Sequence, residues 1–320
     1  MNKYAIIMGG GKGTRMKSDL PKVLHELLGE PFLAHSIATL KQAGAERVIT
    51  ITGYRHDLVE EVMKGQCEFA VQEPQLGTGH AVMQAHQLEN EEGITIVANG
   101  DCPTVTKETY EKLYAMMESE NAEMAVLTAV PDDSAAYGRV IRRADGTVEK
   151  IVEFKDADEQ EKAVREINTG IYAFDNKSLF EGLKLIKNNN ANHEYYITDL
   201  VEILQSLGKK VIAVACEDFM EAAGMNDCVE QATVEAYLRD RINHKWMKEG
   251  VTIHDPKNTW IGPFAEFGHD VVIYPGTHIF GHSKIGSHVT LLPGVYGENV
   301  TIADNTVVEP YTVIRKNQEK

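Results

Sequence analysis

Short apolar runs alternate with segments of helical spacing through the first 225 residues of the chain. Strands are predicted where Val, Ile and Ala are concentrated, at 5–8, 47–52, 68–72, 94–98, 124–130, 166–174 and 210–215. Helices are predicted at 31–43, 55–64, 75–85, 176–187 and from 194 onward. A hairpin is predicted at 137–154, around the turn Asp145-Gly146. This alternation indicates an α/β domain with a mostly parallel sheet and helices on both faces.

A different pattern begins near residue 250, after a long predicted helix at 226–248. Apolar residues recur every six positions, with a one-residue slip before position 302, at Ile273, Ile279, Ile285, Leu291, Ile302, Val308 and Ile314. Hexapeptide repeats are typical of a parallel β-helix with three hexapeptides in each coil, so 251–315 would form about three coils. An antiparallel sandwich is the alternative, but the alternation of apolar and polar residues and the regular hairpin turns that it needs are missing. The predicted domains are 1–225 and 250–320, joined by a connector helix at 226–249.

The composition limits the classes of partner. The chain has 320 residues, of which 43% are hydrophobic, enough for about two domains with cores of their own. A formal net charge of −16 argues against nucleic acid as a partner, because no basic face could form without acidic neighbours. Cysteines 67, 102, 216 and 228 show no C-x-x-C spacing, so neither a zinc site nor a disulfide framework is indicated. Because no run of 18 apolar residues exists and Met1 leads directly into a strand, we expect a cytoplasmic protein with no membrane partner.

One segment concentrates glycine and positive charge. The strand at 5–8 is followed by Gly9, Gly10, Gly11, Lys12, Gly13, Arg15, Lys17 and Lys22. Glycines let backbone N–H groups approach phosphate oxygens, and the cations supply a local positive field. This combination favours a polyphosphate ligand over an ordinary glycine-rich turn. Gln72 and Asp101 also follow predicted strands, and the carboxyl ends of parallel strands are where such sheets bind ligands.

The spacing of this loop excludes two common phosphate-binding motifs. In a Walker A loop Lys is followed by Ser or Thr, but Lys12 is followed by Gly13. A dinucleotide fingerprint beginning at Gly9 or Gly11 would need glycine at position 14 or 16, but these positions are Thr14 and Met16. The run 11–25, Gly-Lys-Gly-Thr-Arg-Met-Lys-Ser-Asp-Leu-Pro-Lys-Val-Leu-His, instead matches the G-x-G-T-R-[ML]…P-K signature of sugar-nucleotide pyrophosphorylases. It closely resembles the bacterial N-acetylglucosamine-1-phosphate uridyltransferases, and the resemblance extends over most of the chain.

The resemblance implies a Rossmann-like nucleotide-diphospho-sugar transferase domain followed by a short left-handed parallel β-helix. Members of this family make UDP-N-acetylglucosamine, a cell-wall precursor, and pyrophosphate from UTP and N-acetylglucosamine 1-phosphate. An oxygen of the sugar phosphate attacks the α-phosphorus of UTP, which needs positioning and charge neutralisation but no covalent protein nucleophile. The flat flanks of such β-helices commonly pack against copies of themselves, so a homotrimer is expected.

The resemblance also assigns the nucleotide contacts. Backbone groups of Met8 to Gly11 would hold the nucleoside, and Arg15 would face the β- and γ-phosphates. Lys22, fixed by Pro21, would neutralise charge on the reacting phosphates. Gln72 and Gly77-Thr78 would read the uracil edge, for which one Gln amide offers a donor and an acceptor.

A metal and an acceptor sugar complete the implied site. Asp101, which follows Asn99-Gly100, and Asn226 would hold Mg²⁺, because one carboxylate and one amide oxygen suit an ion that keeps its waters and binds phosphate. The catalytic residues would be Arg15, Lys22 and Asp101. Taken singly, Asp101 could be a turn former and Asn226 a helix N-cap. The positions matching the acceptor-sugar contacts are Gly138, Glu153 and Asn168, although Glu153 alone would be taken for a solvated strand residue.

Two departures from the family pattern affect these expectations. Gly9-Gly10 stands where Ala-Ala is usual, which would loosen the loop and lower affinity for the base. Bifunctional relatives continue through a longer β-helix with an acetyltransferase site, so we expect a short form without that activity. Two alternatives remain open. One is a nucleotidyltransferase that joins glucose 1-phosphate to UTP or dTTP, and the other is a non-catalytic sugar-nucleotide sensor.

Overall fold

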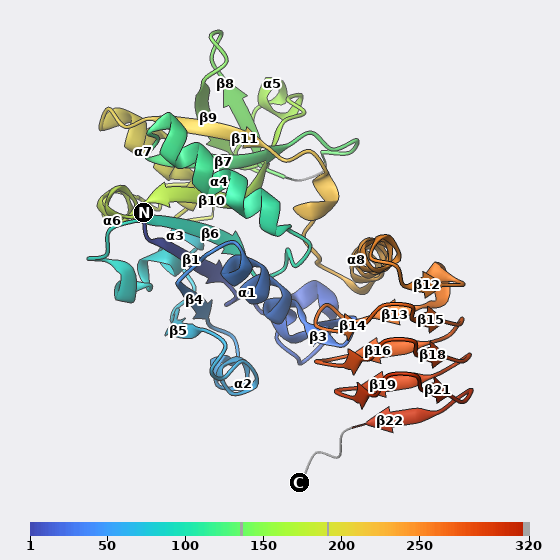
Figure 1. Cartoon of the computed structure of the whole chain (residues 1–320). Coiled ribbons are helices and arrows are strands. Elements are labelled where there is room, and N and C mark those ends of the chain that lie inside the picture. The colour runs from blue at the N-terminus through green and yellow to red at the C-terminus, as the bar shows by residue number, and fades with distance from the viewer. Residues whose placement is uncertain (135–136, 191, 316–320) are drawn as a thin grey trace. The chain divides into compact units, whose positions relative to one another are not determined.

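The computed structural model describes residues 1–134, 137–190 and 192–315 (Figure 1). The chain divides into two compact units, one formed by Met1–Leu24 and Phe32–Asn226 and the other by His25–Pro31 and Asp227–Lys320. The second unit therefore takes a short segment from early in the sequence, which the sequence pattern alone does not indicate. Among the described residues, no helix combines the length and the apolar character needed to cross a membrane.

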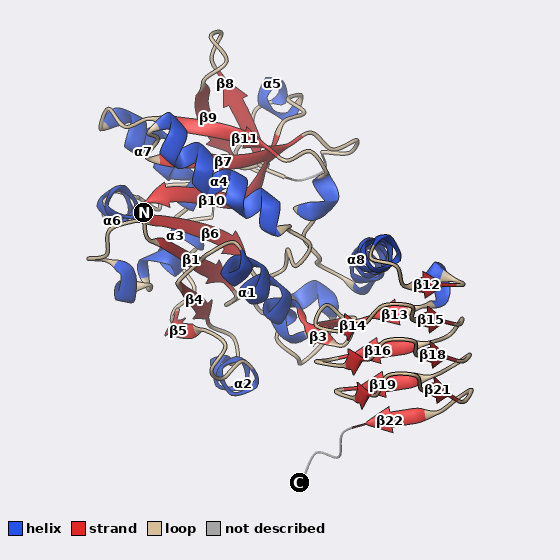
Figure 2. Ribbon diagram, in the orientation of Figure 1, coloured by secondary structure: helices blue, strands red, loops and turns tan. Residues whose placement is uncertain are grey.

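The first unit is built on one mixed sheet (Figure 2). Its central strands are β1 (Lys3–Met8), β4 (Arg47–Thr52), β5 (Glu68–Val71), β6 (Ile94–Asn99), β7 (Met124–Ala129), β10 (Ile167–Asp175) and β11 (Val211–Ala215). They lie in the order β11-β7-β10-β6-β1-β4-β5, and all neighbours are parallel except that β10 runs antiparallel to β6 and β7. The hairpin of β8 (Arg139–Arg142) and β9 (Val148–Val152) extends from β10. The predicted α/β class is confirmed.

Helices cover both faces of this sheet, each over its own apolar cluster. The helices of the unit are α1 (Phe32–Gln42), α2 (His56–Val62), α3 (Thr78–Met83), α4 (Lys107–Glu120), α5 (Glu159–Lys162), α6 (Asn176–Leu183) and α7 (Leu200–Ser206), of which α5 has no buried residue. Buried residues of α1 and α4 belong to one cluster, and those of α3, α6 and α7 belong to the other. Helix α4 is not among the helices predicted from the sequence, although Tyr110, Leu113, Tyr114 and Met117 have helical spacing and are buried.

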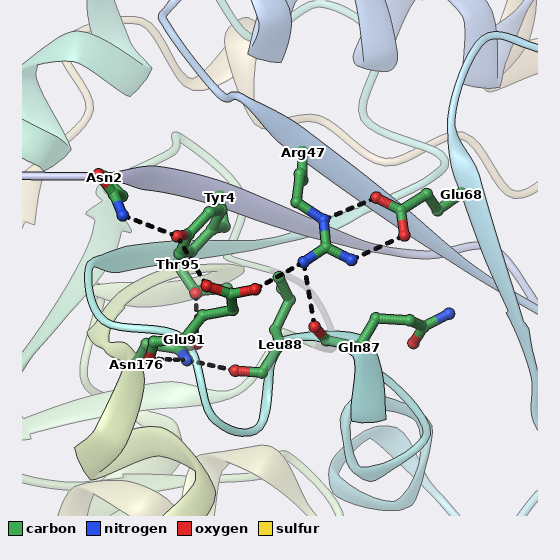
Figure 3. Close-up of polar contacts among 9 residues, drawn as sticks. All are labelled: Asn2, Tyr4, Arg47, Glu68, Gln87, Leu88, Glu91, Thr95 and Asn176. Carbon is green, nitrogen blue, oxygen red and sulfur yellow. Dashed lines mark hydrogen bonds and ion pairs between the residues drawn. The ribbon is translucent and has the colours of Figure 1, made fainter.

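A polar network ties the amino ends of four strands together (Figure 3). Arg47, the first residue of β4, donates to both carboxylate oxygens of Glu68, each at 2.8 Å, and to Glu91 Oε1 at 3.0 Å. The Tyr4 hydroxyl donates to the other oxygen of Glu91 at 3.4 Å, and Thr95 Oγ1 donates to Asn176 Oδ1 at 2.6 Å. These contacts anchor β1, β4, β5 and β6 at one edge. The carboxyl ends of the same strands, at the opposite edge, are left for a ligand.

The second unit is a parallel β-helix preceded by helix α8 (Cys228–Lys248). Its strands are β12 (Thr252–Ile253), β13 (Trp260–Ile261), β14 (Glu266–Phe267), β15 (Val272–Ile273), β16 (His278–Phe280), β17 (Lys284–Ile285), β18 (Thr290–Leu291), β19 (Tyr296–Glu298), β20 (Thr301–Ile302), β21 (Val307–Val308) and β22 (Val313–Arg315). They stack as three parallel sheets, β12-β15-β18-β21, β13-β16-β19-β22 and β14-β17-β20. The apolar residues that recur every six positions, from Ile273 to Val308, are each at least 93% buried. With the three parallel sheets, their burial confirms the predicted left-handed β-helix.

The predicted slip in the six-residue period lies between Gly297 and Ile302. Ile279 pairs with Gly297, so glycine occupies a core position that the repeat would give to an apolar side chain. A Cβ at this position would lie 3.1 Å from both Ile279 Cδ1 and Val300 Cγ2. The next pair, Ile285 and Ile302, is one residue closer in sequence than Ile279 and Gly297. The coil is therefore one residue shorter directly after Gly297.

A short hairpin from early in the chain packs on the β-helix. It consists of β2 (Glu26–Leu27) and β3 (Glu30–Pro31), and its turn residue Gly29 has φ +81°. A Cβ at Gly29 would lie 2.9 Å from Phe280 Cγ, so only glycine permits this close approach. Burial beside Glu26 and Glu298 raises the pKa of Glu30 to about 7.

Candidate active site

A cavity of about 640 Å³ lies in the first unit, where β1 and β6 end. Its lining comes from the glycine-rich loop, the start of α3, the end of β6 and the last residue of the unit. The lining residues are Met8, Gly9, Gly10, Gly11, Lys12, Gly13, Thr14, Arg15, Lys22, Val23, Gln72, Gln75, Gly77, Thr78, Ala81, Asn99, Asp101, Glu194 and Asn226. Residues more than 200 positions apart in sequence thus line the same cavity.

The glycine-rich loop is held at both ends. Gly9 N donates to Ile51 O at 2.9 Å, and Tyr54 N donates to Gly10 O at 3.0 Å, so the loop follows the end of β4. Gly13 has φ +66° and precedes a single 3-10 turn at Thr14–Met16. A Cβ on Gly13 would lie 2.6 Å from Lys22 Cβ. Glycine is therefore required at position 13 both for its backbone conformation and for the approach of Lys22.

Lys22 joins the two residues predicted to bind metal. Its ammonium donates to Asp101 Oδ2 and, at 2.9 Å, to Asn226 Oδ1. The guanidinium of Arg15 donates to the same Asn226 oxygen at 2.7 Å. Two cationic and two oxygen-bearing side chains therefore meet at one wall of the cavity.

Local structure explains how Asp101 and Asn226 come together. Asp101 follows the end of β6, and Met225 N donates to Asp101 O at 3.2 Å. Upstream of Met225, Glu221 Oε2 accepts hydrogen bonds from Thr106 Oγ1 at 2.8 Å and Thr109 Oγ1 at 2.6 Å. The segment before Asn226 is thus fixed to the segment after Asp101.

Asn226 is not the cap of the helix that follows it. Asp227 caps α8, because its side chain accepts from Val229 N and Glu230 N, each at 2.9 Å. The helix begins at Cys228 rather than at 226, and the Asn226 side chain faces Arg15 and Lys22. The simple N-cap interpretation of Asn226 is therefore wrong.

The donor set at this wall fits a divalent cation. Asp101 Oδ2 and Asn226 Oδ1 both lie within hydrogen-bond distance of a single atom, the Lys22 ammonium nitrogen. A carboxylate oxygen and an amide oxygen are ligands for a hard cation that completes its shell with water and phosphate. An ion placed between them would have to displace the Lys22 ammonium, which is attracted to the same oxygens.

The far side of the cavity is formed by the segment that opens α3. Gln72 is 6% exposed, and its amide nitrogen donates to Gly77 O at 2.9 Å and lies 3.2 Å from His80 Nδ1. With the nitrogen engaged in this way, the amide oxygen is the atom suited to accept a hydrogen bond from a ligand. Gly77 has φ +109°, and a Cβ there would lie 2.6 Å from Tyr195 O. The turn therefore packs directly against the segment that carries Glu194.

Gln75 connects this segment to the glycine-rich loop. Its side-chain nitrogen donates to Gly10 O, the same carbonyl that accepts from Tyr54 N. The residue was not among those predicted for the site, although it lies only three positions after Gln72. Glu194 was also missed, and no local signal marks it, because only the fold brings it to the cavity.

The residues matching the acceptor-sugar contacts form a second group outside the cavity lining. A Cβ on Gly138 would lie 3.5 Å from Glu153 Oε2 and 3.7 Å from Asn168 Cβ, so the three positions adjoin. Asn168 Nδ2 donates to the Tyr172 hydroxyl at 2.6 Å. Next to Asn168, the register of β10 shifts and Thr169 O accepts from the cavity residue Asn99 at 3.3 Å. This bulge joins the second group to the cavity.

Acidic side chains surround this second group. Burial raises the pKa of the Glu153 carboxyl, and the negative charges of Asp156, Asp199 and Glu194 raise it further. Burial, with Glu202 and Asp156, raises the pKa of Asp199 to about 6. Burial and neighbouring negative charge therefore make both carboxyl groups weaker acids than an exposed carboxyl group.

Most of the predicted site residues line the same cavity. These are Met8, Gly9, Gly10, Gly11, Arg15, Lys22, Gln72, Gly77, Thr78, Asn99, Asp101 and Asn226. Four predicted residues lie outside the lining, namely Gly100, Gly138, Glu153 and Asn168. Gly100 N donates to Met8 O at 3.0 Å, which links the ends of β1 and β6.

Comparison with known proteins defines the class. Residues 5–169 match the family described as MobA-like NTP transferase domain. A UDP-glucose pyrophosphorylase solved in complex with UDP-glucose superimposes with a TM-score of 0.58 at 18% identity, covering 75% of this chain and 100% of the other. A protein from Bacillus anthracis assigned as a glucose-1-phosphate thymidylyltransferase, solved with a sucrose, gives 0.60 at 20% identity, covering 74% and 96%. The family match and the fold define a nucleotidyltransferase.

Closer relatives identify the family. The bifunctional protein GlmU of Geobacillus thermodenitrificans is 48% identical over 309 residues, covering 96% of this chain and 67% of the relative. The bifunctional protein GlmU of Exiguobacterium sp. is 46% identical over 318 residues, covering 99% and 69%. The chain belongs to the GlmU family. Enzymes of this kind use a divalent metal, which agrees with the oxygen donors at Asp101 and Asn226.

Proposed function

We propose that this protein transfers the uridylyl group of UTP to N-acetylglucosamine 1-phosphate. An oxygen of the sugar phosphate bonds to the α-phosphorus of UTP as the bond from that phosphorus to the bridging oxygen breaks. UDP-N-acetylglucosamine forms, and pyrophosphate leaves with the bonding electron pair. The observation that supports this most strongly is the meeting of Arg15, Lys22, Asp101 and Asn226 at one wall of a cavity beside the glycine-rich loop.

The chain's own residues account for the needs of this reaction. The attacking phosphate oxygen carries no proton at neutral pH, so no general base is required, only alignment and neutralisation of charge. Arg15 and Lys22 would bind the triphosphate and stabilise the negative charge that develops on the leaving pyrophosphate. Backbone groups from Met8 to Gly11 would hold the nucleoside against the end of β4.

Mg²⁺ is the metal that we propose for Asp101 and Asn226. When bound, it would neutralise charge on the phosphates and help to align them. Of the side chains at this wall, Asp101 supplies the negative charge that attracts the ion, and Asn226 supplies a neutral oxygen.

Selection of the base is assigned to Gln72 with Gly77-Thr78. The amide oxygen of Gln72 suits the N3–H donor of uracil, a donor that cytosine lacks. Thymine presents the same N3–H, so this contact alone does not separate UTP from dTTP. We assign selection of the sugar to the second group, Gly138, Glu153 and Asn168, in which Glu153 would bond a sugar hydroxyl and Asn168 the N-acetyl group or the ribose.

The test is a substrate matrix with pyrophosphate release as the readout. UTP and dTTP are each paired with N-acetylglucosamine 1-phosphate and with glucose 1-phosphate, with Mg²⁺ present or removed by chelation. We expect the highest kcat/KM for UTP with N-acetylglucosamine 1-phosphate. A preference for glucose 1-phosphate would favour the alternative nucleotidyltransferase.

A non-catalytic sugar-nucleotide sensor would release no pyrophosphate with any pair. Asp101→Ala supplies the matched control, because it removes the charged metal ligand and should abolish Mg²⁺-dependent turnover. Turnover that is unchanged in this variant would contradict the role given to Asp101. Homotrimer formation, location in the cytoplasm and the lack of acetyl transfer stay predictions.

A further inference from the structure

Two turns of the β-helix stack imidazole and carboxylate groups on its outer surface. After β14 the chain reads Gly268-His269-Asp270, and after β17 it reads Gly286-Ser287-His288. Because β14 and β17 pair in register, the residues of one turn lie above their counterparts in the next. Asp270 and His288 occupy equivalent positions, and both adopt the left-handed conformation, with φ of 57° and 58°.

Three side-chain atoms converge at this corner. His288 Nδ1 lies 3.6 Å and His269 Nε2 lies 3.9 Å from Asp270 Oδ2. All three ligand atoms lie within 4.8 Å of one another. Donors bonded to zinc at about 2.0–2.1 Å in a tetrahedral site are about 3.3 Å apart, so small side-chain rotations would bring these three atoms into position.

The surroundings orient the ligands. Ser287 Oγ lies 2.8 Å from His269 Nδ1, which leaves the Nε2 atom of that ring directed at Asp270. An outer hydrogen bond of this kind fixes the ring and its tautomer, as it does for many metal-binding histidines. His288 N also donates to His269 O at 2.9 Å, so the two turns are joined through the backbone as well. Only the side chains have to adjust on binding.

We propose that His269, Asp270 and His288 form a surface site for a first-row divalent ion, with Zn²⁺ as the ion best suited to it. Two imidazoles and one carboxylate are a common zinc donor set, with the fourth position left to water. Imidazole ligands do not suit Mg²⁺, which prefers oxygen donors, so this site is distinct in chemistry from the pair Asp101 and Asn226. Since the ligands come from successive coils, the bound ion would link them.

The experiment titrates the full chain with Zn²⁺ in competition with a colorimetric chelator. The Asp101→Asn variant is titrated in parallel, so that zinc bound at the phosphate-binding site is recognised separately. We expect one zinc-binding site per chain that persists in Asp101→Asn. His269→Asn and His288→Asn should each lower the zinc affinity by at least about tenfold, because loss of a ligand costs more than loss of an outer partner.

His282→Asn is the matched control. His282 is also exposed on the β-helix, but it stacks on Phe264 and is not part of the cluster, so its loss should leave zinc affinity unchanged. As a second readout, Zn²⁺ should raise the thermal unfolding midpoint of the wild type and of His282→Asn, but not that of His288→Asn. The proposal is overturned if the wild type binds no zinc at this site. It is also overturned if His269→Asn and His288→Asn bind zinc as tightly as the control.

Discussion

The glycine-rich loop allows the same substitution to be made at two positions with opposite expected results. Gly10→Ala should stabilise the protein, and Gly13→Ala should destabilise it and reduce turnover. Gly10 does not have a positive φ, and a Cβ there would lie 3.4 Å from Gly53 N and Thr52 O, an ordinary contact. An alanine that fits stabilises by about 0.4–1 kcal/mol, because the unfolded chain has fewer conformations to lose.

At Gly13 two costs combine. A non-glycine residue at φ +66° costs about 1–2 kcal/mol. In addition, carbon atoms pack at about 3.5–4.0 Å, so a Cβ only 2.6 Å from Lys22 Cβ would move the Lys22 stem by about 1 Å. A displacement of that size at a group that aligns substrate costs up to about 100-fold in rate. Gly13→Asn would relieve part of the backbone strain but keep the overlap, so it should recover stability more than activity.

The assays are urea unfolding for stability and pyrophosphate release for turnover. The expected order of stability is Gly10→Ala, wild type, Gly13→Asn, Gly13→Ala, and both position-13 variants should have strongly reduced kcat/KM. If Gly13→Ala matched Gly10→Ala in both assays, the reasoning about Lys22 would be refuted. The same data would show whether glycine at position 10 weakens the loop.

Three further predictions concern other parts of the molecule. Lys22→Met should raise the affinity of the nucleotide-free protein for Mn²⁺ by about tenfold, because it removes a charged hydrogen bond that competes with the ion for Asp101. Turnover should fall by about 100-fold. Unchanged Mn²⁺ affinity in an electron paramagnetic resonance titration would contradict this. Gln75→Ala should raise the KM for UTP several-fold with a smaller change in kcat, since it removes one of the two hydrogen bonds that hold Gly10 O. Steady-state kinetics would show an equal fall in kcat if Gln75 acted only in the transition state. Glu30, with its pKa raised to about 7, binds a proton more tightly in the folded than in the unfolded chain, so its contribution to stability is present below about pH 4.5 and is lost as pH rises through about 7. Glu30→Gln should therefore be more stable than wild type at pH 8 by about 1–2 kcal/mol after allowance for solvent screening, with little difference at pH 4; parallel pH profiles of urea unfolding for the two proteins would rule this out.

The architecture follows from local sequence patterns. Continuous apolar runs reflect strands that are buried on both faces, and the six-residue periodicity reflects burial inside the coil. Both are local properties, so the sheet and the β-helix could be predicted from the sequence. Helix α4 also has a local signal, the helical spacing of Tyr110, Leu113, Tyr114 and Met117. The antiparallel direction of β10 and the docking of residues 25–31 on the β-helix depend on long-range packing, and no local pattern encodes them.

The candidate site shows the same division. The glycine-rich loop could be recognised because its residues are consecutive and chemically unusual. Asn226 is brought to Lys22 by long-range hydrogen bonds. Glu221 accepts from Thr106 and Thr109, and Met225 N donates to Asp101 O. The N-cap of α8 is Asp227, one position after Asn226, because the Asp227 side chain reaches the free N–H groups of the helix.

The central claim is that this cavity joins a uridylyl group to N-acetylglucosamine 1-phosphate. It is tested most directly by measuring pyrophosphate release from UTP with that sugar phosphate, beside glucose 1-phosphate and beside the Asp101→Ala variant. We predict rapid, Mg²⁺-dependent release with N-acetylglucosamine 1-phosphate, slow release with glucose 1-phosphate and none from Asp101→Ala. Equal rates with both sugar phosphates, or full turnover by Asp101→Ala, would contradict the account.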